Sequence, residues 1–169
     1  QNAPVGLKQS DEIYFYVRLK NVIDYDHFIE EKNSKELPNT KEEETKLLER
    51  YIKMSNIEVP PTNSGLYFIE DLAGQGELPQ RGQIMTLNYL GYFINGESFS
   101  NTYETRRPFN VKLGEDDLIS GFQEGLMKMK AKGHYTLVIP SHLAYGEEGT
   151  KTIPPNTTLI FEIDVISIQ

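Results

Sequence analysis

The sequence contains no cysteine and no tryptophan, and its basic residues are outnumbered by acidic ones. The absence of cysteine excludes disulfide bonds, thiolate catalysis and cysteine-ligated zinc. With 17 lysine and arginine residues against 25 aspartate and glutamate residues, the net charge of -8 repels phosphate backbones, so we expect no nucleic-acid partner. No run approaches the ~18 consecutive apolar residues of a membrane-spanning helix, so we expect no membrane span.

Histidine, the side chain that most often binds metals or acts as a base, is also scarce. The three histidines, His27, His134 and His142, show no metal-ligand spacing, and we expect solvated or structural roles for them. Residues 108–161 instead carry aromatic and branched apolar side chains between glycine-rich turns. This composition is typical of a site that works by shape and exclusion of water, and it predicts neither a metal nor a cofactor.

The length of 169 residues fits one domain and an extension, because domains cluster near ~100–150 residues. The chain starts at Gln1 without an initiator methionine, a basic segment or an apolar signal core, so a targeting segment removed before this position is one expectation.

Residues 11–22, DEIYFYVRLKNV, alternate apolar and polar side chains, which predicts a strand near residues 12–22. They resemble the final apolar stretch, LIFEIDVISI. Two interpretations stay open: an extra edge strand, or the tail of a preceding repeat in a longer parent chain.

Residues 24–55 are rich in charge and predict a helix near residues 41–55. Thr40 and Glu43 have the spacing of a capping box, and acidic residues fill the first turn, where the helix dipole favours them. Apolar residues recur with helical spacing at Leu47, Leu48, Tyr51, Ile52 and Met54. This stripe packs on the neighbouring domain or, as an alternative, forms a dimerisation surface.

The cluster Pro60, Pro61, Asn63, Ser64 and Gly65 ends the helical region and predicts a domain boundary, with an extension at 1–60 and a domain at 61–169. Strands are predicted at residues 66–72, 83–92, 109–112, 135–140 and 158–168, and one short helix at 121–130. This order indicates an α+β fold in which an antiparallel, strongly curled sheet wraps over one short helix.

The order of motifs from LNYLG through NGESF, RPFNVKLG, LISGFQEGL and LAYG to IPPNTTLIFEIDV resembles the FKBP family of peptidyl-prolyl cis-trans isomerases. The resemblance covers residues 66–168. It implies an enzyme that assists protein folding by twisting X-Pro bonds in an apolar aromatic pocket, with no cofactor and no covalent intermediate.

The resemblance also implies the site residues. Catalytic roles fall to Tyr89, Phe99, Ile119, Tyr145 and Phe161. Here Ile119 offers its backbone N-H to the substrate carbonyl, and Tyr145 offers its hydroxyl. Substrate-binding roles fall to Ser100, Phe109, Leu118, Phe122 and Ile153.

Two positions depart from the family pattern. Phe122 stands where many members have tryptophan, which predicts a slightly deeper pocket. Ser100 replaces the usual acidic residue, which removes one polar wall and predicts reduced catalytic efficiency and reduced affinity for FKBP-binding macrolides. Two alternatives to the enzyme stay open: a weakly active or inactive peptide-binding or chaperone module, and an envelope assembly protein.

The expected partners are proline-containing peptides or unfolded proteins, with a homodimer through the N-terminal helix as a further hypothesis. The resemblance to family members with N-terminal extensions predicts the periplasm, or an outer-membrane lipoprotein of a bacterium, with the cytoplasm as the alternative.

Overall fold

A computed structural model describes residues 37–169 of the chain. The strand predicted near residues 12–22 and His27 lie outside this part. The helices are α2 (Lys41–Met54), α3 (Thr102–Thr105), α4 (Ser120–Leu126) and the 3-10 helix η1 (Ser141–Leu143). The strands are β1 (Tyr67–Leu72), β2 (Ile84–Phe93), β3 (Ser98–Asn101), β4 (Phe109–Lys112), β5 (His134–Ile139) and β6 (Leu159–Ile168).

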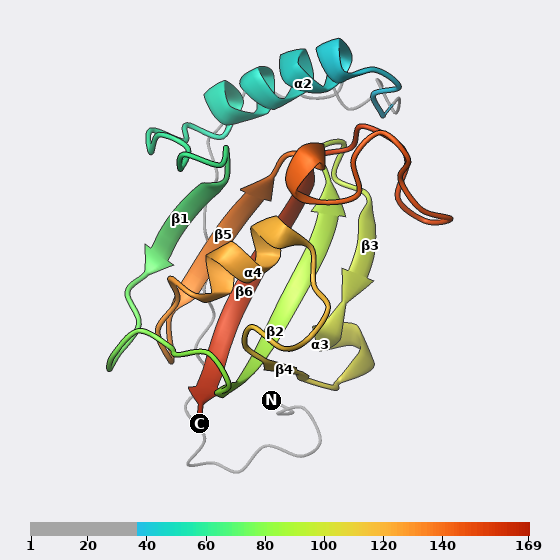
Figure 1. Ribbon diagram of the computed structural model, residues 1–169. Coiled ribbons are helices and arrows are strands. Elements are labelled where there is room, and N and C mark those ends of the chain that lie inside the picture. Colours follow the sequence, from blue (N-terminus) through green and yellow to red (C-terminus); the bar gives the residue numbers. More distant parts are fainter. Residues whose placement is uncertain (1–36) are drawn as a thin grey trace, which may run out of the picture.

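The strands form an antiparallel sheet with the order β1-β5-β6-β2-β3, and β4 pairs with β2 beside this path. Helix α4 lies across one face of the curled sheet, and α2 lies across one end of it (Figure 1). Similarity to solved structures, given below, agrees with this architecture, so the predicted α+β fold is confirmed. No helix within residues 37–169 has the length and hydropathy of a membrane span.

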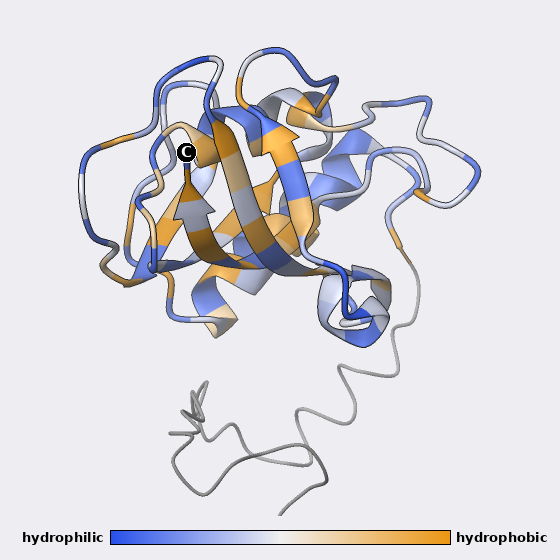
Figure 2. Ribbon diagram, turned by 90° about the horizontal axis from the view of Figure 1, so that it is seen from below, coloured by the Kyte–Doolittle hydropathy of each residue, from blue (hydrophilic) through white to orange (hydrophobic). Residues whose placement is uncertain are grey.

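The core lies between the sheet and α4 because alternate side chains of each strand face the helix. On β6 the inward set is Leu159, Phe161, Ile163 and Val165, all buried, as the period of two requires. Figure 2 shows the hydrophobic strands at the centre of the molecule and the hydrophilic residues concentrated in the loops around them. This apolar face of the sheet thus forms the floor on which a site can be built.

Helix α4 packs closely on β5 through two glycines. A Cβ atom at Gly121 would lie 2.5 Å from Ile139 Cγ2, and one at Gly125 would lie 2.5 Å from Leu137 Cδ1. The helix spans Ser120–Leu126, so the predicted range 121–130 ended too late. Tight turns follow, in which the Lys128 and Met129 N-H groups donate to carbonyls three residues earlier. These turns bury Met129 and lead the chain back into β5.

Helix α2 starts as the sequence predicts. Thr40 accepts a hydrogen bond from the Glu43 N-H, and the Glu43 side chain accepts from the Thr40 N-H, which completes the capping box. The apolar stripe is half-buried, and the Tyr51 hydroxyl lies 3.5 Å from that of Tyr92 on β2. The helix therefore packs against the sheet of its own chain, and both the boundary at residue 60 and a dimer through this helix stay predictions.

Strand β3 and helix α3 were not predicted. The Asn101 side chain accepts hydrogen bonds from the N-H groups of Tyr103 and Glu104, and its amide donates to the Glu104 carboxylate. An asparagine followed three residues later by glutamate is a helix-start signal, so this short helix was recognisable. The four residues of β3 are too few to show a period of two.

Candidate active site

A cavity of about 330 Å³ opens between the inner face of the sheet, the start of α4 and the connection from β5 to β6. Its lining comprises Tyr89, Phe99, Ser100, Phe109, Asp117, Leu118, Ile119, Phe122, Tyr145, Thr150, Thr152, Ile153, Leu159 and Phe161. All ten residues predicted for the site are among them. Segments far apart in the sequence thus converge on one cavity, although the roles of the individual residues stay predictions.

The interior of the cavity is an aromatic cluster centred on Tyr89 and Phe161. The Tyr89 ring lies edge-on to Phe109, Phe122 and Phe161, with centroid distances of 5.9, 6.0 and 5.6 Å. Phe161 also contacts Phe99 at 5.5 Å and Phe122 at 4.8 Å. Such pairs stabilise one another beyond the apolar area they bury, so the walls are held in fixed orientations.

Strand alternation places these rings. Leu87, Tyr89 and Gly91 share the inner face of β2, and Gly91 is buried beside Phe99. A Cβ atom at Gly91 would lie 2.8 Å from two atoms of the Phe99 ring and 3.1 Å from Phe161 Cε1. The missing side chain therefore makes the space in which Phe99 and Phe161 meet.

Four polar groups border this apolar interior: the hydroxyls of Tyr89, Ser100 and Tyr145, and the backbone N-H of Ile119. The Tyr89 hydroxyl lies 3.0 Å from that of Ser100, so the serine keeps a hydrogen bond at the position where the family pattern has a carboxylate. The Ile119 N-H, just before α4, has no hydrogen-bond partner within residues 37–169. Neither has the Tyr145 hydroxyl, whose side chain is 43% exposed at the rim. A bound carbonyl group can therefore accept from two donors that the described fold leaves unpaired.

Four lining residues were missed by the sequence analysis. Leu159 shares the inner face of β6 with Phe161, so the alternation used for that strand could have placed it at the cavity. Asp117 immediately precedes Leu118 and is an exposed acidic residue of the lining. Thr150 and Thr152 lie in an irregular loop, where no periodic pattern indicates the direction of a side chain.

A cluster of titratable groups with shifted pKa values lies on the opposite face of the sheet. His134 Nδ1 lies 2.6 Å from Asp164 Oδ1, and the Tyr103 hydroxyl donates to the other carboxylate oxygen. The hydrogen bond raises the pKa of His134 and lowers that of Asp164. Burial, followed by the contact with Asp164, raises the pKa of Tyr103. His134 therefore forms a structural contact with Asp164, in agreement with the solvated or structural role expected for it.

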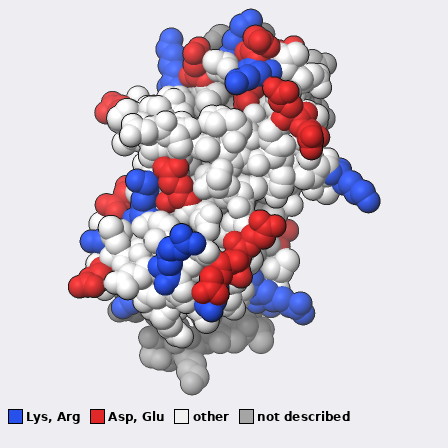
Figure 3. Space-filling view, viewed as in Figure 1, with Lys and Arg blue, Asp and Glu red and all other residues white. Residues whose placement is uncertain are grey.

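Ion-binding residues are not grouped at the cavity. Within residues 37–169, no three histidine, aspartate or glutamate side chains come together as a metal site would require. Figure 3 shows mixed acidic and basic side chains on α2 and on the lower part of the same face, with a largely uncharged surface between them. The arrangement suits a neutral, apolar ligand.

Comparison with known proteins agrees with this geometry. Residues 75–166 match the family model described as FKBP-type peptidyl-prolyl cis-trans isomerase. The chain belongs to this family.

Similar family members include bacterial FkpA proteins. The isomerase FkpA of Buchnera aphidicola subsp. Baizongia pistaciae is 44% identical over 108 residues, which are 64% of this chain and 42% of the relative. FkpA of Escherichia coli K12 is 38% identical over 111 residues, or 66% and 40%. The FK506-binding protein of Neisseria meningitidis is 38% identical over 106 residues, or 62% of this chain and 97% of the relative.

Among solved structures, the crystal structure of FkpA from Escherichia coli superposes with a TM-score of 0.68 at 36% identity. The match covers 75% of this chain and 59% of that chain. This FKBP-family chain thus spans less than half the length of the first two FkpA relatives, and the alignment with the short Neisseria protein covers nearly all of that relative.

Proposed function

We propose that this protein is a peptidyl-prolyl cis-trans isomerase that assists protein folding by binding X-Pro segments in the cavity. One observation carries the proposal: the Ile119 N-H and the Tyr145 hydroxyl, two donors without a hydrogen-bond partner among residues 37–169, lie at the edge of an aromatic cavity. Family membership and the similarity to FkpA proteins named as isomerases support it.

The mechanism follows from the barrier that the enzyme must lower. Rotation about an X-Pro bond breaks no covalent bond, and its barrier of ~18–20 kcal/mol comes from the partial double bond of the amide. The planar amide is more dipolar than the twisted one, so a dry apolar cavity disfavours the ground state. The Ile119 N-H and the Tyr145 hydroxyl can hold carbonyl groups of the substrate and so fix the X-Pro segment in the cavity while its amide twists. Each ~1.4 kcal/mol gained this way increases the rate tenfold.

The rate of isomerisation of a proline-containing peptide tests the proposal. We expect the native protein to accelerate the reaction, Phe161→Ala to lose at least about tenfold in kcat/KM, and Tyr145→Phe to lose less. Phe161 contacts three aromatic rings of the cavity, whereas Tyr145 contributes one hydroxyl at the rim. A native rate equal to the uncatalysed rate would overturn the enzyme assignment.

A second candidate is a binding or chaperone module that holds proline segments with little turnover. Ser100 favours it, because a neutral hydroxyl polarises Tyr89 less than a carboxylate does. Saturable binding of a proline peptide, with unaccelerated isomerisation and protection of an unfolded protein from aggregation, would support this candidate. Under either candidate, FKBP-binding macrolides are proposed ligands, with affinity reduced by the same substitution.

Location and assembly are separate proposals. The similarity to bacterial FkpA proteins supports a periplasmic location or an outer-membrane lipoprotein, which fractionation of the native cells would test. The apolar stripe of α2 supports a homodimer or a docking contact in an envelope assembly. Sedimentation of residues 1–169 as a dimer, against a monomer for residues 61–169, would support self-association through this helix, and monomers in both cases would contradict it.

A further inference from the structure

The connection between β5 and β6 is the least regular wall of the cavity. This connection, residues 140–158, contributes Tyr145, Thr150, Thr152 and Ile153 to the lining. Apart from η1 it contains no regular element. Its position relative to α4, and so the distance from the Tyr145 hydroxyl to the Ile119 N-H, depends on what holds its two ends.

Glu44 of α2 holds both ends. This side chain is 5% exposed, although glutamate is rarely buried. Its Oε1 atom accepts hydrogen bonds from the Ser141 N-H at 2.7 Å and from the Thr158 hydroxyl at 2.7 Å, and its Oε2 atom accepts from the Ser141 hydroxyl at 2.6 Å. One carboxylate thus joins the first and last parts of the connection.

Further hydrogen bonds lead from this contact to the cavity. The Ser141 carbonyl accepts from the Gly146 N-H at 2.8 Å, and the Gly146 carbonyl accepts from the Asn156 N-H at 2.8 Å. The Asn156 side chain in turn donates to the Asn39 carbonyl at 3.0 Å, just before α2. Tyr145 lies immediately before Gly146, so its backbone is part of this hydrogen-bond network, which starts at Glu44 and ends at Asn39.

The binding groups match the chemistry of a carboxylate. A carboxylate offers only acceptors, and a backbone N-H and two hydroxyl groups supply three donors to it. Hydrogen bonds to charged groups stabilise more than neutral ones, and a buried donor left without a partner is destabilising. Glu44 lies in the first turn of α2 because the Thr40 cap sets where the helix begins.

We propose that Glu44 is a positioning residue for the isomerase site: it joins the two ends of the connection 140–158 and so sets the position of the Tyr145 hydroxyl. The inference rests on the proposed isomerase function. The N-terminal helix is thereby part of the working site, although α2 contributes no residue to the cavity lining. A displacement of about 1 Å in a reacting geometry can cost up to ~10²-fold in rate, so a loosened connection lowers turnover without changing the lining residues.

The experiment compares full-length variants at a temperature where each is fully folded by circular dichroism. Glu44→Ala removes all three acceptor contacts, and Glu44→Gln places an amide N-H group against donors. We expect kcat/KM for a proline peptide to fall about tenfold in Glu44→Ala and about threefold in Glu44→Gln. Glu42→Ala, an exposed residue of the same turn with the same charge change, is the matched control and is expected to keep the native value.

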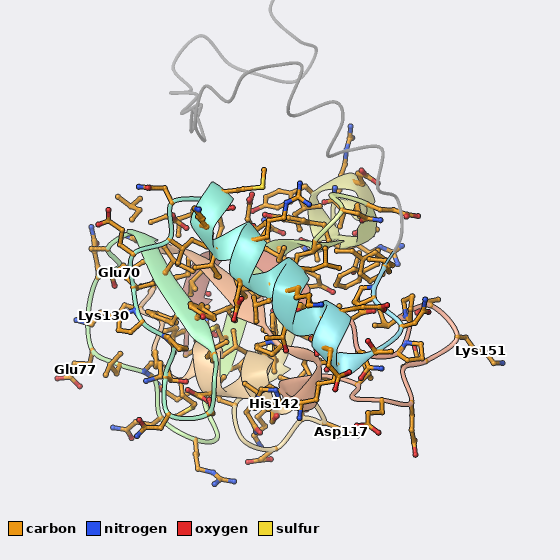
Figure 4. The ribbon with its side chains drawn as sticks, turned by 90° about the horizontal axis from the view of Figure 1, so that it is seen from above. Glu70, Glu77, Asp117, Lys130, His142 and Lys151 are labelled. Carbon is orange, nitrogen blue, oxygen red and sulfur yellow. The ribbon has the colours of Figure 1, made fainter. Side chains whose placement is uncertain are left out.

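A second readout reports on the connection itself. Lys151 projects from the exposed tip of the connection (Figure 4), so trypsin cleavage after it measures how readily the loop opens. Cleavage after Lys151 should accelerate in Glu44→Ala and not in Glu42→Ala. Cleavage after Arg106, which follows α3, is the internal reference and should not change. Thr158→Val removes one donor while leaving α2 and the cavity lining intact, so it keeps the test valid if Glu44→Ala fails to fold.

The outcomes separate this proposal from the proposed function. An inactive native protein would overturn the isomerase assignment, while cleavage after Lys151 would still decide whether Glu44 holds the connection. Cleavage equal in Glu44→Ala and Glu42→Ala would overturn the proposal, as would a faster opening with unchanged kcat/KM. A loss of activity fully explained by a smaller folded fraction would reduce Glu44 to a stability contact and would also overturn it.

Discussion

Ser100 decides how polar the wall beside Tyr89 is. Its hydroxyl, 3.0 Å from that of Tyr89, makes a neutral hydrogen bond. Ser100→Asp would supply a charged acceptor, and such bonds are about twice as strong as neutral ones. We therefore expect Ser100→Asp to raise kcat/KM about fivefold, and macrolide affinity in the same direction, in a peptide isomerisation assay and by calorimetry. Ser100→Asn has nearly the same size without the charge, and equal gains in both variants would contradict the electrostatic explanation.

The His134–Asp164 pair predicts a pH dependence of stability. His134 has a pKa raised above 6.5, so its contribution is complete below pH 6.5 and is lost as the pH rises through the raised value. Asp164 has a pKa lowered below 3.8, so its contribution is complete above pH 3.8 and is lost as the pH falls through the lowered value. The pair therefore stabilises the fold most between about pH 3.8 and pH 6.5.

Both side chains are partly exposed, at 32% and 47%, so we expect a contribution to the free energy of unfolding of below about 1 kcal/mol. Urea unfolding from pH 4 to pH 9 measures it. His134→Gln should remove the loss of stability above about pH 6.5. A variant that shows the same profile as the native protein would assign the dependence to other groups.

At the scale of the elements, the contact between β2 and β3 depends on Gly91. An added methyl group would meet Phe99 at 2.8 Å and Phe161 at 3.1 Å. Gly91→Ala should therefore cost about 1–3 kcal/mol in the free energy of unfolding and displace two walls of the cavity. The kcat/KM for a proline peptide, measured at equal folded fraction, should fall at least about tenfold, because the Phe99 and Phe161 rings form walls of the cavity.

Gly96→Ala is the matched control for this prediction. Gly96 has a φ of 85°, so alanine there strains the backbone, but nothing lies within 4 Å of the added methyl group. This variant should lose stability and keep the native kcat/KM. A similar loss of activity in both variants would show that stability, and not the position of the rings, controls the rate.

The strands were predictable because a half-buried sheet imposes a period of two on the sequence. Strand β4 matches its predicted bounds, and Tyr89 and Phe161 were placed on inner faces by alternation alone. The role of Glu44 was not predictable. An acidic residue in a first helical turn is explained by the helix dipole, and its donors lie 97 and 114 positions away in the chain. Thr150 and Thr152 were missed because an irregular loop has no period.

At the scale of the whole molecule, the charge of -8 predicts a preference among clients. Glu147 and Glu148 are exposed just after Tyr145, and Asp117 lines the cavity. Like charges slow encounter, so peptides with acidic flanking residues should be isomerised more slowly than basic ones at low salt. Added salt should reduce the difference, because the Debye length shortens to ~10 Å at 0.1 M.

A peptide series that varies only in charge tests this prediction. Replacing Glu147 and Glu148 by glutamine should bring the acidic and basic peptides closer together without changing a neutral peptide. Equal turnover of acidic and basic peptides by the native protein at low salt would contradict the prediction.

The place of β6 in the sheet has a consequence for biosynthesis. This strand, Leu159–Ile168, lies between β5 and β2, so it joins the two halves of the sheet and supplies Phe161 to the cavity. A ribosome makes residues 1–158 before this strand. During that time β1 and β5 have no described pairing with β2, β3 and β4. The nascent chain therefore cannot close its sheet until this last strand has been translated and has left the exit tunnel. A protein of this design folds late, and its own prolines are exposed to folding helpers until then.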